Sequence, residues 1–144
     1  GGIAGYRGEL ATLAMWWGKV GASLRYSEAG ISAFRVAIEI NAALSGAFSR
    51  DIAEAYRRLG FALQDLSGHT DYFAAASAQG ADEPRAIDGE MLAEAVRCFE
   101  FSRVAYQSYG ETHPKSGSLD LADFLSGHLE YLRETSAGAG IIFV

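Results

Sequence analysis

The side chains best suited to chemistry in this chain are three histidines, His69, His113 and His128, and one cysteine, Cys98. Imidazole and thiolate groups bind zinc and related metals, and dedicated sites show a regular ligand spacing along the sequence. Here no two histidines lie four residues apart, and no histidine completes the Glu-x-x-His spacing of di-iron helical bundles. The sequence therefore predicts no metal site and no bound cofactor.

The sequence also shows no pattern typical of a catalytic nucleophile. Cys98 lies beside Phe99 within a helical pattern, where cysteine acts as a small buried hydrophobic residue rather than a reactive thiolate. The chain contains no Gly-x-Ser-x-Gly elbow, no Gly-x-Gly-x-x-Gly fingerprint and no P-loop. We therefore predict no catalytic residues and expect that the chain by itself is not an enzyme.

Composition argues against two further classes of partner. The chain carries 12 Lys and Arg against 18 Asp and Glu, a net charge of −6. Nucleic acids bind a concentrated basic surface, and the basic residues here are scattered, so nucleic-acid binding is not expected. No stretch approaches the ~20 apolar residues of a transmembrane helix, which predicts a soluble protein. A single cysteine favours a reducing intracellular compartment or an organelle interior.

Hydrophobic periodicity predicts the elements that carry these residues. Apolar residues recur at three- and four-residue intervals through most of the chain, and Pro84 and Pro114 fall in the polar stretches between them. The predicted helices span residues 6–25, 27–48, 49–67, 70–78, 87–109 and 118–136. This pattern predicts an all-α fold, a single bundle of five to six helices over residues 1–136.

Two of these helices have distinctive apolar patterns. Residues 27–48 are apolar on most sides, which is usual for a central helix, so we expect this helix to be the most buried. Residues 6–25 carry one apolar face, and two glycines, Gly18 and Gly21, mark a place where another helix could approach closely. The members of that face follow helical spacing: Leu10, Leu13, Trp17, Val20 and Leu24.

The last eight residues follow a different pattern. Residues 137–140 read Ala-Gly-Ala-Gly, a flexible spacer. Four apolar, β-prone residues follow: Ile141, Ile142, Phe143 and Val144. A helical bundle offers no sheet to such a segment, and an unpaired strand recruits other strands. We therefore expect an extended tail over residues 137–144, and we assign partner binding to its four apolar residues together with Trp16.

Several segments, taken in order, resemble one known family. Residues 48–53 read Phe-Ser-Arg-Asp-Ile-Ala, and residues 70–75 read Thr-Asp-Tyr-Phe-Ala-Ala. Residues 92–95, Leu-Ala-Glu-Ala, then lead into residues 99–106, Phe-Glu-Phe-Ser-Arg-Val-Ala-Tyr. Residues 48–144 thereby resemble the helical region that precedes the catalytic core of class 3 lipases of the diacylglycerol-lipase type.

The resemblance implies that residues 141–144 match the first strand leading into that core. Two departures limit what it implies about activity. Tyr106 is followed by Gln-Ser-Tyr-Gly rather than directly by glycine, and the nucleophile serine, aspartate, histidine and oxyanion loop of the family have no counterpart here. The resemblance therefore implies a non-catalytic piece or descendant of such an enzyme.

Three hypotheses about function remain open from the sequence. The leading one is a non-catalytic helical interaction or scaffold module, a subunit or segment of a larger assembly that binds a protein partner or a second copy of itself. The second is an N-terminal or accessory helical segment of a lipid-hydrolysing enzyme. The third is a helical pocket for an apolar small molecule, because aromatic residues make up 12% of the chain.

Overall fold

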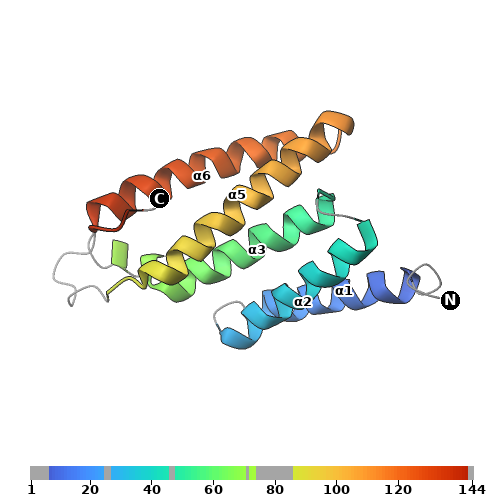
Figure 1. Ribbon diagram of the computed structural model, residues 1–144, viewed down its shortest axis with the longest axis horizontal. Helices are drawn as coiled ribbons and strands as arrows, with labels where there is room; N and C mark the ends of the chain where they lie inside the picture. The colour runs from blue at the N-terminus through green and yellow to red at the C-terminus, as the bar shows by residue number, and fades with distance from the viewer. Residues whose placement is uncertain (1–6, 25–26, 46–47, 71, 74–85, 143–144) are drawn as a thin grey trace.

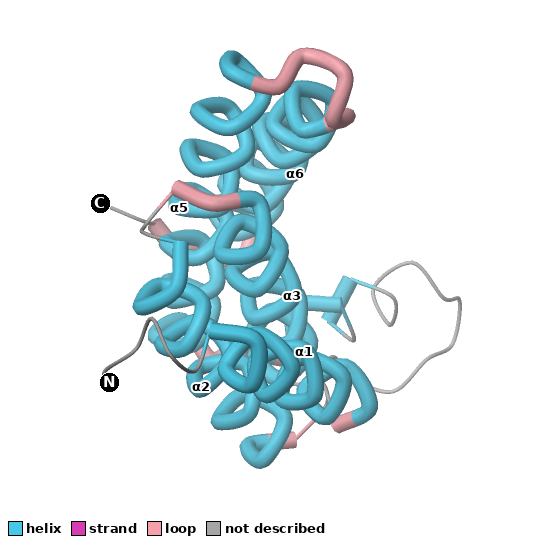
Figure 2. Tube along the Cα trace, turned by 90° about the vertical axis from the view of Figure 1, so that its right-hand side faces the viewer, coloured by secondary structure: helices cyan, strands magenta, loops and turns pink. Residues whose placement is uncertain are grey.

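The computed structural model describes residues 7–24, 27–45, 48–70, 72–73 and 86–142, and these residues form five helices and no strand. The predicted all-α bundle is therefore confirmed. The helices are α1 (Arg7–Ser23), α2 (Glu28–Ser45), α3 (Arg50–Ser67), α5 (Gly89–Thr112) and α6 (Ser118–Gly138). They follow one another in space from α6 through α5 and α3 to the α1–α2 pair (Figures 1 and 2). Most of the helix predicted over residues 70–78 lies outside the described residues.

Short polar side chains fix where the helices begin. Ser27 accepts a hydrogen bond from the Gly30 N–H at 3.2 Å, and Ser49 accepts one from the Ile52 N–H at 3.2 Å. Serine is among the residue types preferred at this capping position. Asp88 caps α5 in the same way, through the Met91 N–H at 3.1 Å. Such caps satisfy backbone donors that a helix leaves unpaired, at about 1 kcal/mol each.

The helix predicted to be most buried, residues 27–48, is not the central one. Nine of the 18 residues of α3 are buried, whereas α2 exposes Ala42 and Ala43 and leaves Val36 and Ile40 half-buried. The reason is position: α3 packs against α2 on one side and α5 on the other, while α2 lies between α3 and the outermost helix α1 (Figure 1). The uniform apolar character of α2 does not by itself place it at the centre.

Helices α3 and α5 pack closely along the seam between them. Gly60 faces the fully buried ring of Phe99, and a Cβ at this glycine would lie 2.7 Å from the ring. Further along, the buried Ser102 hydroxyl donates to the Ala53 carbonyl at 2.5 Å. The small residues on α3 therefore let the two helices approach closely enough for a side chain of one to bond the backbone of the other.

The junction of α5 and α6 also depends on a glycine. The sequence predicts that α5 stops at Gly110, but the helix continues to Thr112 and Gly110 is buried within its last turn. A Cβ at Gly110 would lie 2.7 Å from the Leu119 side chain. This glycine therefore serves close packing rather than termination, and the chain turns instead at Gly117, whose φ is 79°.

The last helix extends two residues into the segment 137–140, which the sequence predicts as a spacer. Helix α6 runs to Gly138, and Gly140 adopts a left-handed conformation with φ 82°. The Gly140 N–H donates to the Ala137 carbonyl at 3.0 Å, and the Ile141 N–H donates to the Ser136 carbonyl at 2.7 Å. This is the Schellman arrangement, in which a left-handed glycine closes the helix end. The glycine therefore fixes the direction in which the tail leaves.

Two glycine substitutions separate packing from helix propensity. Gly60→Ala gains about 1 kcal/mol of propensity but overpacks the seam at Phe99, which costs about 1–3 kcal/mol, so we expect lower stability. Gly127→Ala is the matched control, because nothing lies within 4 Å of a Cβ there. That change should raise stability by about 1 kcal/mol. Urea unfolding followed by circular dichroism measures both, and a Gly60→Ala protein more stable than the parent would contradict the tight seam.

Candidate functional site

A row of exposed apolar side chains follows α1. Its members are Leu13, Trp16, Val20 and Leu24, which are 45%, 55%, 38% and 44% exposed. They repeat every three or four residues and so share one side of the helix. We call them the α1 row. The Lys19 ammonium lies 4.9 Å from the centre of the Trp16 ring, a cation–π contact at the edge of the row.

Three members of the α1 row, Leu13, Val20 and Leu24, belong to the apolar face that the sequence predicts for the first helix, and all three lie exposed. Helix α1 meets α2 through a different side, where the Phe34 ring lies 2.8 Å from the Cβ that Gly21 lacks. A residue with no side chain lets the phenyl ring settle against the backbone of α1. Because the contact runs through Gly21, Leu13, Val20 and Leu24 turn outward. Trp16, assigned to partner binding from the sequence, lies among them.

Of the four tail residues assigned to partner binding, the structure describes Ile141 and Ile142. Ile141 is partly buried, and its side chain would lie 3.8 Å from a Cβ at Gly89 on α5. Ile142 is 81% exposed, and neither residue forms a strand. Phe143 and Val144, also assigned to partner binding, lie outside the described residues. Of the predicted binding residues, Trp16 and Ile142 are therefore the ones that the structure places on an open surface.

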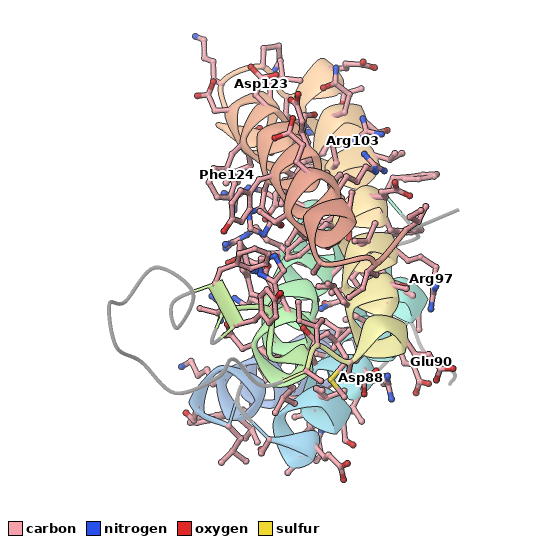
Figure 3. All side chains as sticks on the ribbon, turned by 90° about the vertical axis from the view of Figure 1, so that its left-hand side faces the viewer. Asp88, Glu90, Arg97, Arg103, Asp123 and Phe124 are labelled. Atoms are coloured by element: carbon pink, nitrogen blue, oxygen red, sulfur yellow. The ribbon has the colours of Figure 1, made fainter. Side chains whose placement is uncertain are left out.

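A groove of about 760 Å³ runs between the start of α5 and the end of α6. Charged side chains form much of its wall: Asp88, Glu90, Arg97, Glu100 and Arg133. Arg133 pairs with Glu100 across the two helices. Figure 3 shows Glu90 and Arg97 along α5, on the side opposite Phe124. A second hollow, of about 450 Å³, has mostly apolar walls beside Tyr109, His113 and Pro114. The larger hollow thus combines charged side chains with apolar ones from Val96, Ile141 and Ile142.

Two histidines, a glutamine and a threonine form a connected polar network between α3 and α6. Gln64 is the hub: its Oε1 lies 2.8 Å from His128 Nε2, and its Nε2 lies 3.4 Å from His69 Nδ1. His69 Nε2 lies 2.8 Å from the Thr135 hydroxyl, which donates to the Tyr131 carbonyl at 2.8 Å. His69 is 1% exposed and Gln64 is 6% exposed. Two of these bonds, Gln64–His128 and His69–Thr135, join residues 64 and 66 positions apart in the chain.

Aromatic rings surround this network. His128 packs edge-on against Phe99, with ring centres 4.9 Å apart, and parallel to Phe124 at 6.1 Å. His69 contacts Phe73 at 4.7 Å and Tyr131 at 5.8 Å. Such surroundings disfavour a charged imidazole, so burial lowers the pKa of both histidines, and for His69 the facing His128 lowers the pKa further. The network is therefore built for two neutral rings.

The network escaped the sequence analysis because nothing in the pattern pairs its members. The spacing of the histidines bears on metal binding and carries no information about a shared partner such as Gln64. The described residues contain no group of three or more His, Cys, Asp or Glu placed to hold a metal ion. The one available signal was a glutamine directly after Leu63 in the buried stripe of α3, since a buried amide requires partners.

Cys98 is buried, as predicted, and 6% exposed. Burial first, and then the nearby Glu94 carboxylate, raise the pKa of its thiol to about 12. A thiol with that pKa is almost entirely protonated near pH 7, and the thiolate is the nucleophilic form. Cys98 therefore packs as a small hydrophobic side chain.

Comparison with known proteins adds no relative: no family model matches the chain, and neither does any curated protein or solved structure. Within the part of the chain that the structure describes, none of the helices combines the length and apolar character needed to cross a membrane. The candidate sites therefore rest on geometry alone. They are the α1 row on the surface and the Gln64 network inside.

The bond between His69 and Thr135 can be tested by removing one partner. Thr135→Val leaves the His69 Nε2–H without an acceptor in a buried place, which should lower stability by about 1–3 kcal/mol. Ser126→Ala is the control on the same helix, because the exposed Ser126 hydroxyl bonds only the Ala122 carbonyl one turn before it. That control should change stability by less than about 0.5 kcal/mol. Urea unfolding measures both variants. Equal losses of unfolding free energy in Thr135→Val and Ser126→Ala would contradict a stabilising role for the His69–Thr135 bond.

Proposed function

We propose that this chain is a non-catalytic helical interaction module, a subunit or segment of a larger assembly, and that it docks through the α1 row. The observation that carries the proposal is the exposure of Leu13, Trp16, Val20 and Leu24 on the outermost helix. Large apolar side chains scattered singly over a surface need no explanation, but a contiguous row with Trp at its middle is typical of an interface.

The partner that fits the row is a protein helix with an apolar row of its own. The four side chains span residues 13–24, about 16 Å of helix, and their three- and four-residue spacing is that by which helices interlock. Charge on the described part of the row is limited to Lys19 at its edge, already engaged by Trp16. An apolar, weakly charged strip of this shape supports helix-on-helix packing over recognition of a charged ligand.

In the purified chain, the available helix of this kind is α1 of a second copy. We therefore expect weak, concentration-dependent self-association above 15.4 kDa, measured by size-exclusion chromatography with light scattering. Trp16→Glu should abolish it, because burying a carboxylate in an apolar interface is strongly unfavourable. Val104→Glu is the matched control, since Val104 is an exposed apolar residue on α5, 42% exposed and away from the row.

Two outcomes would contradict the proposal. One is a monomer at all concentrations up to the millimolar range with the row intact. The other is self-association that Val104→Glu removes and Trp16→Glu does not. Hydrolysis of an acyl ester by the isolated chain would instead support the lipase-type alternative, and a native mass increased by one small apolar ligand would support the pocket alternative.

A further inference from the structure

Helix α6 carries a strip of aromatic rings on one exposed flank. Phe124 is 54% exposed and Tyr131 is 46% exposed, and they lie seven residues, or about two helical turns, apart. The half-buried His128 fills the turn between them. Its ring lies parallel to Phe124, with centres 6.1 Å apart, and its centre is 6.0 Å from that of Tyr131. We call these three rings the aromatic strip, which is about 10 Å long.

A row of acidic side chains runs beside the aromatic strip. Its positions repeat every three or four residues, so they share one side of α6, and all of them are exposed. This acidic row consists of Asp120, Asp123, Gly127, Glu130 and Glu134. None of the described residues forms an ion pair with these four carboxylates. Arg133, the one Lys or Arg of α6, pairs with Glu100 on α5 instead. Figure 3 labels Asp123 and Phe124, one member of each set.

Helix stability alone does not favour this acidic row. Asp120 and Asp123 are three residues apart, Glu130 and Glu134 are four apart, and like charges at these spacings destabilise a helix. Gly127 lies in the middle of α6, where glycine is less stable than alanine. Nothing lies within 4 Å of a Cβ at this glycine, so packing within the described residues does not require it. The missing side chain leaves open backbone between the two exposed rings, where a partner can approach closely.

Charge and shape together define the partner that fits α6. Unpaired carboxylates attract lysine and arginine side chains, whereas they repel nucleic acids and anionic lipids. Two rings seven residues apart match the heptad spacing at which a second helix presents apolar side chains. A second copy of this chain fits poorly, because its net charge is −6. The matching partner is therefore a different protein, with a helix that carries basic residues beside an apolar row.

We propose that the aromatic strip and the acidic row of α6 form a docking surface for a basic amphipathic helix of another protein. Phe124 and Tyr131 anchor the apolar row of that helix, and the four carboxylates pair with its lysine and arginine side chains. Helices α6 and α1 lie on opposite sides of the bundle, so this surface is separate from the α1 row (Figure 1). A chain that docks one partner on each side joins two proteins.

A synthetic peptide of three heptads tests the surface, with leucine at the a and d positions and lysine at the e and g positions. Lysines on both flanks keep the peptide from pairing with itself. Titrated into the ¹⁵N-labelled chain, it should shift the amide NMR signals of residues 120–134 most strongly. A peptide with glutamate in place of lysine should bind about tenfold more weakly or worse. Binding of the lysine peptide should also weaken as salt screens the exposed charges.

Two matched double variants separate the acidic row from the overall charge of the chain. Asp123→Asn with Glu130→Gln should weaken binding of the lysine peptide about three- to tenfold. Glu9→Gln with Glu39→Gln removes the same charge from exposed positions on α1 and α2, and should leave the affinity unchanged. Phe124→Ala should weaken binding about tenfold or more, because aromatic anchors carry much of the energy of an interface.

Charge reversal gives the sharpest test of the docking surface. Asp123→Lys with Glu130→Lys should make the glutamate peptide bind more tightly than the lysine peptide, an exchange that a misfolded variant cannot produce. Two results would overturn the proposal. One is a set of amide shifts centred on the α1 row or spread evenly over the chain. The other is equal affinity of the parent chain for the lysine and glutamate peptides.

Discussion

The close approach of α3 and α5 is the contact on which the rest of the molecule depends. It exists because Gly60 leaves room for the Phe99 ring and because Ser102 reaches the backbone at Ala53. With this seam fixed, α2 packs on the far side of α3 and α6 packs along α5 (Figure 1). The seam also sets where the two histidines meet, since Phe99 forms one wall of the space that His128 occupies.

The Gln64 network shows how a helical core admits polar groups. A buried amide or imidazole is destabilising unless each of its donors and acceptors is paired, and here the chain from His128 to the Tyr131 carbonyl pairs them in one consistent direction. One continuous set of hydrogen bonds therefore pairs polar groups from α3, α6 and the residue that follows α3.

The ends of the bundle differ in what they present to a partner. Helix α6 closes with a Schellman turn at Gly140, and its exposed side carries Phe124 and Tyr131 around the half-buried His128. Helix α1 rests on α2 through Gly21 and turns four large apolar side chains outward. Helices in water are stabilised mainly by burying an apolar face, so a helix that exposes such a face is one whose packing is incomplete in the isolated chain.

The sequence by itself determined the helical class, the approximate helix bounds and the caps at Ser27 and Ser49. These are local properties, set by the spacing of apolar residues and by side chains that bond a backbone three residues away. It also marked Cys98 as a packing residue, because its neighbours in the helix are apolar.

Only the tertiary structure decided which faces are covered. Leu13, Val20 and Leu24 have the same periodicity whether they face a core or water. They are exposed because α1 packs on α2 through the contact of Phe34 with Gly21. Gly110 and the glycines of residues 137–140 show the same limit of sequence-based prediction. A glycine can end a helix or allow a neighbouring side chain to pack closely, and which of these it does depends on the residues around it in the folded chain. The Gln64 network joins residues more than 60 positions apart, and no local pattern encodes such pairings, because they depend on how the helices are arranged in space.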